Sequence, residues 1–347
     1  MIPKNIIVFR FSALGDIAMT VPVLWNLRQR YPDCKVLFVS RPFAKYLIAP
    51  LDGIEFFSVD FKGEYKGLAG IFKLFGKLCQ MHKWDLIVDL HDVLRTKILR
   101  LLFRLKGVRS AVINKGRGEK KALCKRSGKI LVPLTTTIER YRMVFEAGGL
   151  SFKFADFPGR NIYVPVESQI AQKIASIKSP KIGIAPFAKH IWKMWDESKV
   201  IELISMLEQK GCSVFLFGGR GDEAHKLETW ATASDCIHNL AGKLNMREEL
   251  EAMSELDVMV SMDSANMHLA SLVGTHVVSI WGATHPYAGF YGWNQNPENA
   301  VQVELKCRPC SIFGNKPCYR GDFACMMGVT MEMVSAKIDI HANVLSS

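Results

Sequence analysis

The chain has 347 residues, of which 49% are hydrophobic and 22% are charged. A chain of that length is too long to form one ordinary hydrophobic core, and its composition is typical of a globular protein. We therefore expect two domains. No apolar run reaches the roughly 18 residues of a spanning helix, and we therefore expect neither a signal peptide nor a membrane anchor. Nine cysteines, five of them scattered singly, favour a reducing compartment, the cytoplasm.

The chain opens on the pattern of a strand, a tight turn and a helix. A short β-branched run at 6–10 is followed by a turn at 12–16, and apolar residues then recur at helical spacing from 17 to 27. Pro22 falls inside that pattern, so we expect the helix to kink or restart there. Continuous apolar strands between helices indicate a parallel sheet covered on both faces. Further strands are predicted at 35–40 and 84–89.

The formal net charge of +12 is concentrated in one segment. Residues 95–129 contain thirteen basic residues and one acidic residue, Glu119, and the rest of the chain has 32 of each. This indicates a local surface for an anionic partner, which could be a phosphorylated lipid, a membrane or nucleic acid. The alternative is a solvated helical face followed by a mobile basic loop at 114–129.

The alternation of strand and helix begins again past the middle of the chain. Pro158 and Pro165 lie among few periodic residues, so the two halves are predicted to join around 155–180. Two doubly wound α/β halves result, and in such sheets ligands bind beyond the carboxyl ends of the strands. In the second half, strands are predicted at 181–185, 213–217, 256–261 and 276–280, with a helix at 196–209.

Asp16 directly follows a glycine and opens the first predicted helix. A carboxylate there can satisfy free backbone N–H groups as a cap, which for this residue alone is the preferred interpretation. The turn lacks the second and third glycines of a dinucleotide-binding fingerprint, so a hydride-transferring enzyme is disfavoured.

Two loops of the second half have residues suited to a nucleotide diphosphate. Lys193 follows a strand and precedes a helix, where its ammonium group could neutralise a leaving phosphate, although an exposed lysine is the commoner outcome. The glycine-rich strand exit at 218–221 is followed by Asp222 and Glu223, which suits close approach by a ribose. By itself this second signal is weak.

Residues 261–268 lie between a buried strand and the start of a helix. Asp263 and Ser264 are expected at the helix N-terminus, where free N–H groups favour a phosphate, and His268 one turn further on. The alternative is that Asp263 caps the helix and His268 is a packed core residue.

Four cysteines lie within nineteen residues near the C-terminus. Four thiolates at such spacing could hold a structural zinc in a tetrahedral site, which in a reducing compartment is favoured over disulfides. They are Cys307, Cys310, Cys318 and Cys325. No Asp-x-Asp pair occurs in the chain, so the usual carboxylates for a catalytic divalent cation are missing and we expect no cofactor in catalysis.

Six motifs, in order over nearly the whole chain, resemble the ADP-heptose:lipopolysaccharide heptosyltransferase family of inverting glycosyltransferases, glycosyltransferase family 9. They lie at 10–16, 85–91, 193–195, 218–223, 240–243 and 263–270. The late Cys-x-Pro-Cys stretch also resembles one seen in many members.

The resemblance implies the GT-B fold, two Rossmann-like domains facing a cleft. The expected domains are an acceptor domain at 1–165, a donor domain at 166–328, and a C-terminal helix at 329–347 that packs back on the first domain. It implies a metal-independent transfer of heptose from an ADP-sugar to a phosphorylated lipopolysaccharide acceptor. It also implies peripheral contact with the anionic inner leaflet at the cytoplasmic face of the inner membrane.

The resemblance also implies roles for single residues. Asp16 is expected to act as the general base, and Lys193 to stabilise the departing diphosphate. The expected donor-binding residues are Ala188, Lys189, Lys193, Asp222, Glu223, Leu244, Asp263, Ser264, Ala265 and His268. The expected acceptor-binding residues are Arg10, Ser12, Arg95, Lys115, Arg117, Lys120 and Lys121.

The sequence departs from the family pattern at two places. Ala265 replaces the usual glycine, and Ala188 with Lys189 replaces a hydroxyl pair of some members. The donor class is therefore better supported than the donor itself. Alternative interpretations are a GT-B transferase for another nucleotide sugar, a sugar-nucleotide epimerase, and a non-catalytic module that binds nucleic acid. The last is disfavoured because Phe103 is the one aromatic residue among the basic residues of 95–129.

Overall fold

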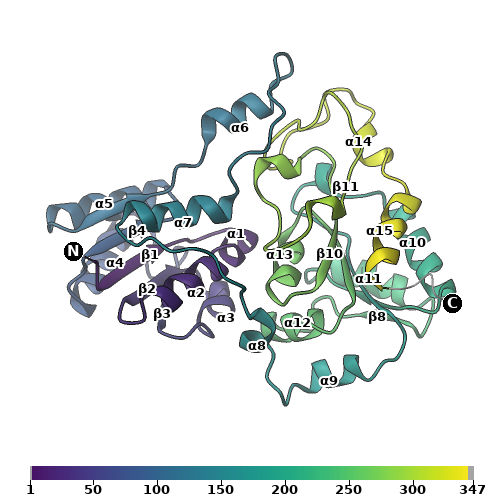
Figure 1. Ribbon diagram of the computed structural model, residues 1–347, viewed down its shortest axis with the longest axis horizontal. Helices are drawn as coiled ribbons and strands as arrows, with labels where there is room; N and C mark the ends of the chain where they lie inside the picture. Colours follow the sequence, from purple (N-terminus) through teal and green to yellow (C-terminus); the bar gives the residue numbers. More distant parts are fainter. Residues whose placement is uncertain (1, 343–347) are drawn as a thin grey trace. The chain divides into compact units, whose positions relative to one another are not determined.

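The computed structural model describes residues 2–342, which form two compact units. Of the described residues, unit 1 contains 2–115 and 136–157, and unit 2 contains 116–135 and 158–342. Each unit is built on one parallel β-sheet with helices around it (Figure 1). In the described part of the chain, no helix combines the length and the apolar character needed to cross a bilayer.

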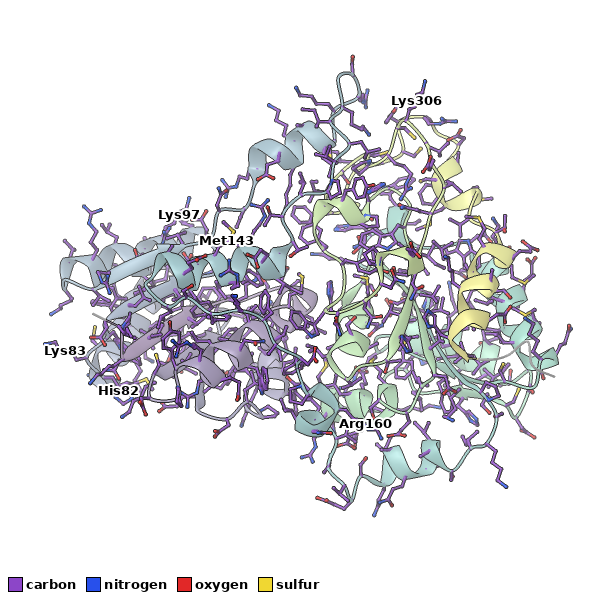
Figure 2. All side chains as sticks on the ribbon, viewed as in Figure 1. His82, Lys83, Lys97, Met143, Arg160 and Lys306 are labelled. Carbon is purple, nitrogen blue, oxygen red and sulfur yellow. The ribbon has the colours of Figure 1, made fainter. Side chains whose placement is uncertain are left out.

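Unit 1 has a five-stranded sheet in the order β3-β2-β1-β4-β5, all parallel. Figure 2 labels Lys97 of α5 and Met143 of α7, whose side chains are both exposed. Its elements are β1 Asn5–Phe9, α1 Leu14–Ala18, α2 Val21–Arg30, β2 Lys35–Ser40, α3 Lys45–Ile48, β3 Ile54–Ser58, α4 Gly67–Met81, β4 Leu86–Asp89, α5 Leu94–Leu105, β5 Arg109–Val112 and α7 Thr137–Ala147.

The predicted restart of the first helix at Pro22 is confirmed. α1 ends at Ala18, and α2 begins at Val21 with the proline in its first turn. A proline is tolerated there because its missing N–H would have no helical partner, whereas inside a continuous helix it would remove a hydrogen bond.

The core of unit 1 follows from continuous apolar strands. Ile7 of β1 pairs with Leu37 of β2 and Ile87 of β4, and these side chains lie in one buried cluster. α4 and α5 cover that face with Leu74, Leu99 and other fully buried residues. The prediction of a parallel sheet is therefore confirmed.

Unit 2 has a six-stranded parallel sheet in the order β11-β10-β9-β6-β7-β8. Its elements are α6 Arg117–Leu123, α8 Gly159–Tyr163, α9 Gln169–Ala175, β6 Lys181–Ala185, α10 Glu197–Gln209, β7 Ser213–Leu216, α11 Asp222–Ala231, β8 Ile237–Asn239, α12 Met246–Met253, β9 Val258–Met262, α13 Ala265–Leu272, β10 His276–Ile280, β11 Ala300–Val301, α14 Ala324–Met327 and α15 Met331–Ala342.

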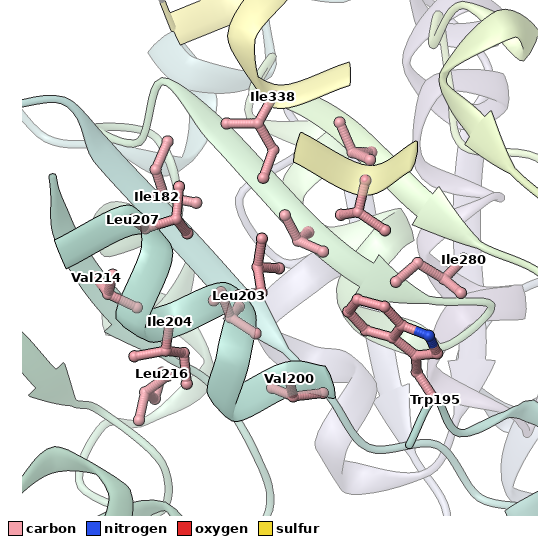
Figure 3. Packing of buried hydrophobic residues seen from close by; sticks show 14 of the residues in the cluster. Ile182, Trp195, Val200, Leu203, Ile204, Leu207, Val214, Leu216, Ile280 and Ile338 are labelled. Carbon is pink, nitrogen blue, oxygen red and sulfur yellow. The ribbon is translucent and has the colours of Figure 1, made fainter. Parts of the chain in front are cut away.

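The C-terminal helix α15 belongs to unit 2, which differs from the expectation that 329–347 packs on the first domain. Ile338 is fully buried in the same cluster as Ile182 and Leu207 (Figure 3). Lys210, the residue after α10, also pairs with Asp339, with 3.0 Å between Nζ and Oδ1. The apolar face of α15 is thus buried against α10 and the sheet of unit 2. Residues 343–347 of the expected helix lie outside the described residues.

The segment 116–135 also differs from the expected boundary at 165, because it belongs to unit 2. Leu134 N–H donates to the carbonyl oxygen of Tyr287 at 2.9 Å, and the Lys120 ammonium lies 4.4 Å from the centre of the Phe290 ring. Lys129 donates to three consecutive carbonyl oxygens, those of residues 307–309. These contacts with a distant part of the chain, which sequence spacing does not reveal, decide the assignment.

Candidate active site

In each unit, chemically active residues lie where the sheet changes its direction of winding. In unit 1 this point lies between β1 and β4, and in unit 2 between β6 and β9. Connections leave such a pair of strands toward opposite sides, so a crevice forms beyond their carboxyl ends. The candidate site residues are therefore those that follow β1, β4, β6 and β9.

After β1, Arg10 and Asp16 form an ion pair with 2.7 Å between Arg10 Nη2 and Asp16 Oδ2. The same carboxylate oxygen accepts a hydrogen bond from Ala13 N–H at 3.1 Å, which fixes it at the start of α1. Among the described residues, the structure gives Oδ1 no hydrogen-bond donor, and the Asp16 side chain is 27% exposed. One oxygen is thus held and the other is available to a ligand.

Arg10 itself is enclosed by protein. Its Nη1 donates to the carbonyl oxygen of Leu90 at 2.7 Å, and its guanidinium lies 5.7 Å from the centre of the Tyr141 ring. Burial by itself lowers the pKa of Arg10, but Tyr141 and Asp16 raise it, and the net change is upward. Arg10 is therefore a fixed cation that holds Asp16.

After β4, His91 lies next to this pair, and the sequence analysis gave it no role. Phe11 N–H donates to His91 Nδ1 at 3.3 Å. Burial, followed by the positive charges of Arg10 and Lys115, lowers the pKa of His91 to about 3. The imidazole is consequently neutral at pH 7. Its place after a strand adjacent to β1 is the signal that could have identified it.

A carboxylate network supports the start of α5. Asp89 is fully buried at the end of β4, and its Oδ1 accepts hydrogen bonds from the N–H groups of His91 and Asp92. Its Oδ2 lies 3.0 Å from Nε of Arg100, which also contacts Asp92. These contacts fix the loop that carries His91.

The expected acceptor-binding residues are divided between the two units. In unit 1, Ser12 is half-buried after β1, Arg95 lies 4.7 Å from the centre of the Phe61 ring, and Lys115 Nζ donates to the carbonyl oxygen of Asp92. Arg95 and Lys115 both act on the pKa of His91, so they lie near the Asp16 site. Unit 2 carries Arg117, Lys120 and Lys121, all on α6.

In unit 2, Lys193 and Asp263 form an ion pair, with 3.0 Å between Nζ and Oδ2. Lys193 ends a short 3₁₀ turn after β6, and Asp263 follows β9, so the two adjacent strands bring them together. Both side chains are largely buried, at 14% and 7% exposure. A buried pair of this kind holds the ammonium group in one place.

The loop that contains Gly314 covers the stem of Lys193. A Cβ at position 314 would lie 2.4 Å from Lys193 Cγ, and Gly314 has a φ of +69°. Glycine is required on both counts, since a side chain would collide with Lys193 and disfavour this backbone conformation. The loop therefore limits the movement of the lysine.

The helix that follows Asp263 presents free N–H groups beside Lys193. α13 begins at Ala265, and its N-cap Ser264 makes no side-chain capping hydrogen bond, its hydroxyl lying instead 3.2 Å from that of Ser261. His268 is buried one turn into the helix. This helix N-terminus next to an ammonium group suits a phosphate. Asp263 is not its capping residue.

The other expected donor residues surround the carboxyl ends of neighbouring strands. Glu223 Oε2 accepts a hydrogen bond from Gly219 N–H at 2.7 Å and closes the glycine-rich loop, while Asp222 is exposed at the start of α11. After β6, Ala188 is half-buried and Lys189 is exposed, and Leu244 is half-buried before α12.

The four late cysteines do not form a metal site within the described residues, where no group of three or more potential ligands is placed to hold a metal ion. Burial, followed by neighbouring Cys307, Cys325 and Cys318, raises the pKa of Cys310 to about 11, so these thiols lie near one another. Lys129 and Arg308 bind the backbone carbonyls of this region instead. The zinc prediction is thus not supported by the described residues.

Comparisons with known proteins identify the family of the chain. The model of glycosyltransferase family 9 (heptosyltransferase) matches residues 71–316, well over half of the chain. Lipopolysaccharide heptosyltransferase 3 of Escherichia coli K12 is 25% identical over 300 residues, which cover 83% of this chain and 84% of the relative.

Two solved structures share the fold. A family 9 glycosyl transferase from Veillonella parvula has a TM-score of 0.74 at 16% identity, covering 99% of this chain and 98% of that one. E. coli heptosyltransferase WaaC with ADP has a TM-score of 0.68 at 17% identity, covering 97% and 100%. The predicted GT-B fold is confirmed. The chain belongs to glycosyltransferase family 9, the heptosyltransferase family, and is a glycosyltransferase.

Proposed function

We propose that this enzyme transfers heptose from ADP-heptose to a hydroxyl of a phosphorylated lipopolysaccharide inner-core acceptor, with inversion at the anomeric carbon and without a catalytic metal. The observation that carries the proposal is the Asp16 carboxylate, with one oxygen held by Arg10 and the other available. Family membership and the E. coli relative's role in lipopolysaccharide synthesis support the sugar and acceptor class.

In the proposed reaction, unit 1 supplies the base. Asp16 Oδ1 takes the proton of the acceptor hydroxyl as that oxygen bonds to the anomeric carbon of the sugar. The bond between this carbon and the diphosphate oxygen breaks, and its electron pair leaves with ADP. Attack opposite to the leaving group inverts the configuration.

Unit 2 is proposed to hold the donor diphosphate. Lys193 Nζ and the N–H groups at the start of α13 stabilise the negative charge that develops on the leaving phosphate. Asp263 keeps the ammonium group in position. These groups supply the positive charge that a divalent cation provides in other transferases, which supports metal independence. Binding of ADP by the structurally similar WaaC supports the choice of nucleotide.

The proposed nucleotide contacts extend along the carboxyl edge of the unit 2 sheet. Glu223 is positioned by the glycine-rich loop to accept hydrogen bonds from the ribose hydroxyls. Further donor contacts are proposed for Ala188, Lys189, Asp222, Leu244, Ser264, Ala265 and His268.

The acceptor phosphates are proposed to bind the basic residues near Asp16. Arg95 and Lys115 lie close enough to His91 to lower its pKa, so positive potential surrounds the proposed base. Ser12, Arg117, Lys120 and Lys121 are the further candidates. An acceptor of this class is anchored in a bilayer, and we propose peripheral contact with the anionic inner leaflet at the cytoplasmic face of the inner membrane.

The test is calorimetric titration of the protein with ADP, UDP, GDP, CDP and NAD in the presence of EDTA, followed by a transfer assay with ADP-heptose and a phosphorylated acceptor. Selective binding of ADP despite the chelator, and a product inverted at the anomeric carbon by NMR, are expected. Preference for another diphosphate would change the donor, a requirement for added metal would remove the proposed role of Lys193, and binding of NAD alone would refute the function.

A further inference from the structure

Helices α4 and α5 form one outward-facing layer of unit 1. They pack on the same sheet face. The rings of Phe75 and Phe103 contact each other between the two helices, edge to face, with 4.9 Å between the ring centres. Their inner faces are therefore accounted for by the core. On their outer faces, exposed apolar side chains remain among the described residues. They are Leu68, Phe72, Leu94, Leu101 and Leu105.

The outer face of α5 is apolar along its length. Leu94, Leu101 and Leu105 are 73%, 56% and 77% exposed. Spacings of seven and four residues place all three on one stripe of the helix. A single exposed leucine is ordinary on a protein surface, but an aligned set indicates an interaction.

The neighbouring helix α4 continues this apolar surface. Leu68 and Phe72 are 63% and 55% exposed and lie one turn apart. Large side chains of this kind lose free energy when they remain in water, so their grouping on two adjacent helices favours a partner that buries them.

The same two helices carry basic residues and no acidic ones. No Asp or Glu occurs in 67–81 or in 94–106. In the part of the chain that the structure describes, Lys77, Arg104 and Lys106 have no carboxylate within 4.0 Å. An apolar stripe flanked by unpaired cations is the pattern of a helix that lies in a membrane interface.

A basic groove of about 940 Å³ opens where α4 and α5 end, at the edge of the sheet opposite to Asp16. Its lining includes Lys4, Lys83, Lys106 and Arg109. The groove's carboxylate, that of Asp85, is used by the backbone N–H groups of Lys4 and Asn5. Figure 2 shows Lys83 and His82 side by side at this end of unit 1. Such a lining suits the phosphate groups of lipid headgroups.

We infer that the α4–α5 face, defined by Leu68, Phe72, Leu94, Leu101 and Leu105, docks on an anionic phospholipid surface. The apolar side chains enter the boundary between headgroups and acyl chains, and the basic groove binds lipid phosphates. This inference rests on the proposed function for its choice of a membrane acceptor, and it assigns the surface that makes the contact.

The placement of α5 gives the docking a consequence for the active site. α5 begins at Leu94, just after the loop that carries His91, and runs about 18 Å to the groove. With α5 in the interface, the carboxyl edge of the sheet lies at the membrane surface. A glycolipid headgroup then reaches Asp16 without leaving the bilayer.

A second copy of this chain is a less suitable partner for the face. Two such faces would bring Lys77, Arg104 and Lys106 toward the same residues of the other copy, and like charges at an interface are unfavourable. Nucleic acid would match the charge but would leave the leucines in water. An anionic bilayer satisfies both features.

The experiment is co-sedimentation of the full chain with vesicles of phosphatidylcholine, either pure or with about one quarter phosphatidylglycerol. The wild type should bind the anionic vesicles strongly and should not bind the pure phosphatidylcholine vesicles strongly. Leu101→Ser with Leu105→Ser should weaken it about tenfold or more, because two apolar anchors are lost. Arg104→Gln with Lys106→Gln should weaken it by about fivefold for each charge.

The controls are matched variants outside the α4–α5 face. Val166→Ser with Ile201→Ser removes two exposed apolar side chains, and Lys153→Gln with Lys178→Gln removes two exposed positive charges. Both control pairs should bind vesicles like the wild type. Every variant should retain wild-type transfer to a water-soluble, deacylated acceptor, because none of these residues belongs to the proposed catalytic site.

Three results would overturn the inference: no binding of wild type to anionic vesicles, equal binding by the leucine pair and its control, or a dimer in sedimentation that the leucine pair abolishes. Failure of the proposed function is a different result. In that case the wild type would bind the vesicles as described but would not transfer heptose to the water-soluble acceptor.

Discussion

Arg10 clamps Asp16 to the end of β1, with 2.7 Å between Nη2 and Oδ2 and a second bond from Arg10 to the carbonyl oxygen of Leu90. Replacing Arg10 by Met should therefore reduce kcat strongly with little change in the donor Kd, and should destabilise the fold by about 3 kcal/mol, since a buried partner is lost. Activity assays and urea unfolding measure the two effects. Added guanidinium should restore part of kcat, and an unaltered kcat would contradict the clamp.

Asp16→Ala should reduce transfer by about a hundredfold or more, because the acceptor hydroxyl loses its base. The affinity for ADP should remain close to that of the wild type, since Asp16 belongs to the unit that does not hold the proposed donor site. Steady-state kinetics and calorimetry on the same preparation separate these outcomes. Loss of ADP binding in this variant would refute the assigned role.

Lys193→Ala should weaken both ADP binding and turnover, each by about tenfold or more, because the ammonium group acts on the diphosphate before and during bond breaking. It also leaves Asp263 as a buried carboxylate beside the phosphate site. Lys193→Ala with Asp263→Asn should therefore bind ADP better than Lys193→Ala. Lys178→Ala, at an exposed position outside the proposed donor contacts, is the control and should bind ADP like the wild type.

His91 should make the stability of unit 1 depend on pH. Burial and the charges of Arg10 and Lys115 lower its pKa to about 3 in the folded protein, whereas an unfolded histidine has a pKa of about 6.5. Between these values the unfolded state binds the extra proton, so stability falls as the pH falls below about 6.5, by up to about 1.4 kcal/mol per pH unit.

Urea unfolding of wild type and His91→Gln at pH 7, 6 and 5 measures this contribution. The variant should show the shallower dependence on pH. The buried His285, whose pKa is lowered to about 4, contributes equally to both proteins and cancels in the comparison. Parallel curves would contradict the assignment.

Lys129 should hold the 116–135 segment on unit 2. Its ammonium group donates to the carbonyl oxygens of Cys307, Arg308 and Pro309, and burial lowers its pKa. Without this anchor the segment should detach more often, so trypsin should cleave Lys129→Met faster after the neighbouring Lys125 and Arg126. Mass spectrometry of the fragments measures the two cleavage rates. Lys125→Met is the matched control, and an unaltered cleavage rate near Arg126 in Lys129→Met would argue against the anchoring role.

Much of the architecture follows from local patterns in the sequence. The apolar runs at 6–10 and 181–185 predicted parallel strands, Pro22 predicted a helix restart, and both are confirmed because they depend on local backbone chemistry. The six motifs, in their order along the chain, led to the family. In the structure five of them follow a strand and the motif at 85–91 contains β4, so they lie toward the carboxyl edges of the two sheets.

The sequence by itself determined the two α/β units, the family, and Asp16, Lys193 and Asp263 as residues of interest. The tertiary structure alone decided which partners they have: Lys193 meets Asp263 seventy residues away because β6 and β9 are neighbours, and His91 joins Arg10 because β4 lies beside β1. It also placed residues 116–135 and α15 in unit 2. Spacing along a chain fixes local conformation, whereas partners are chosen by strand order and by the burial of apolar faces.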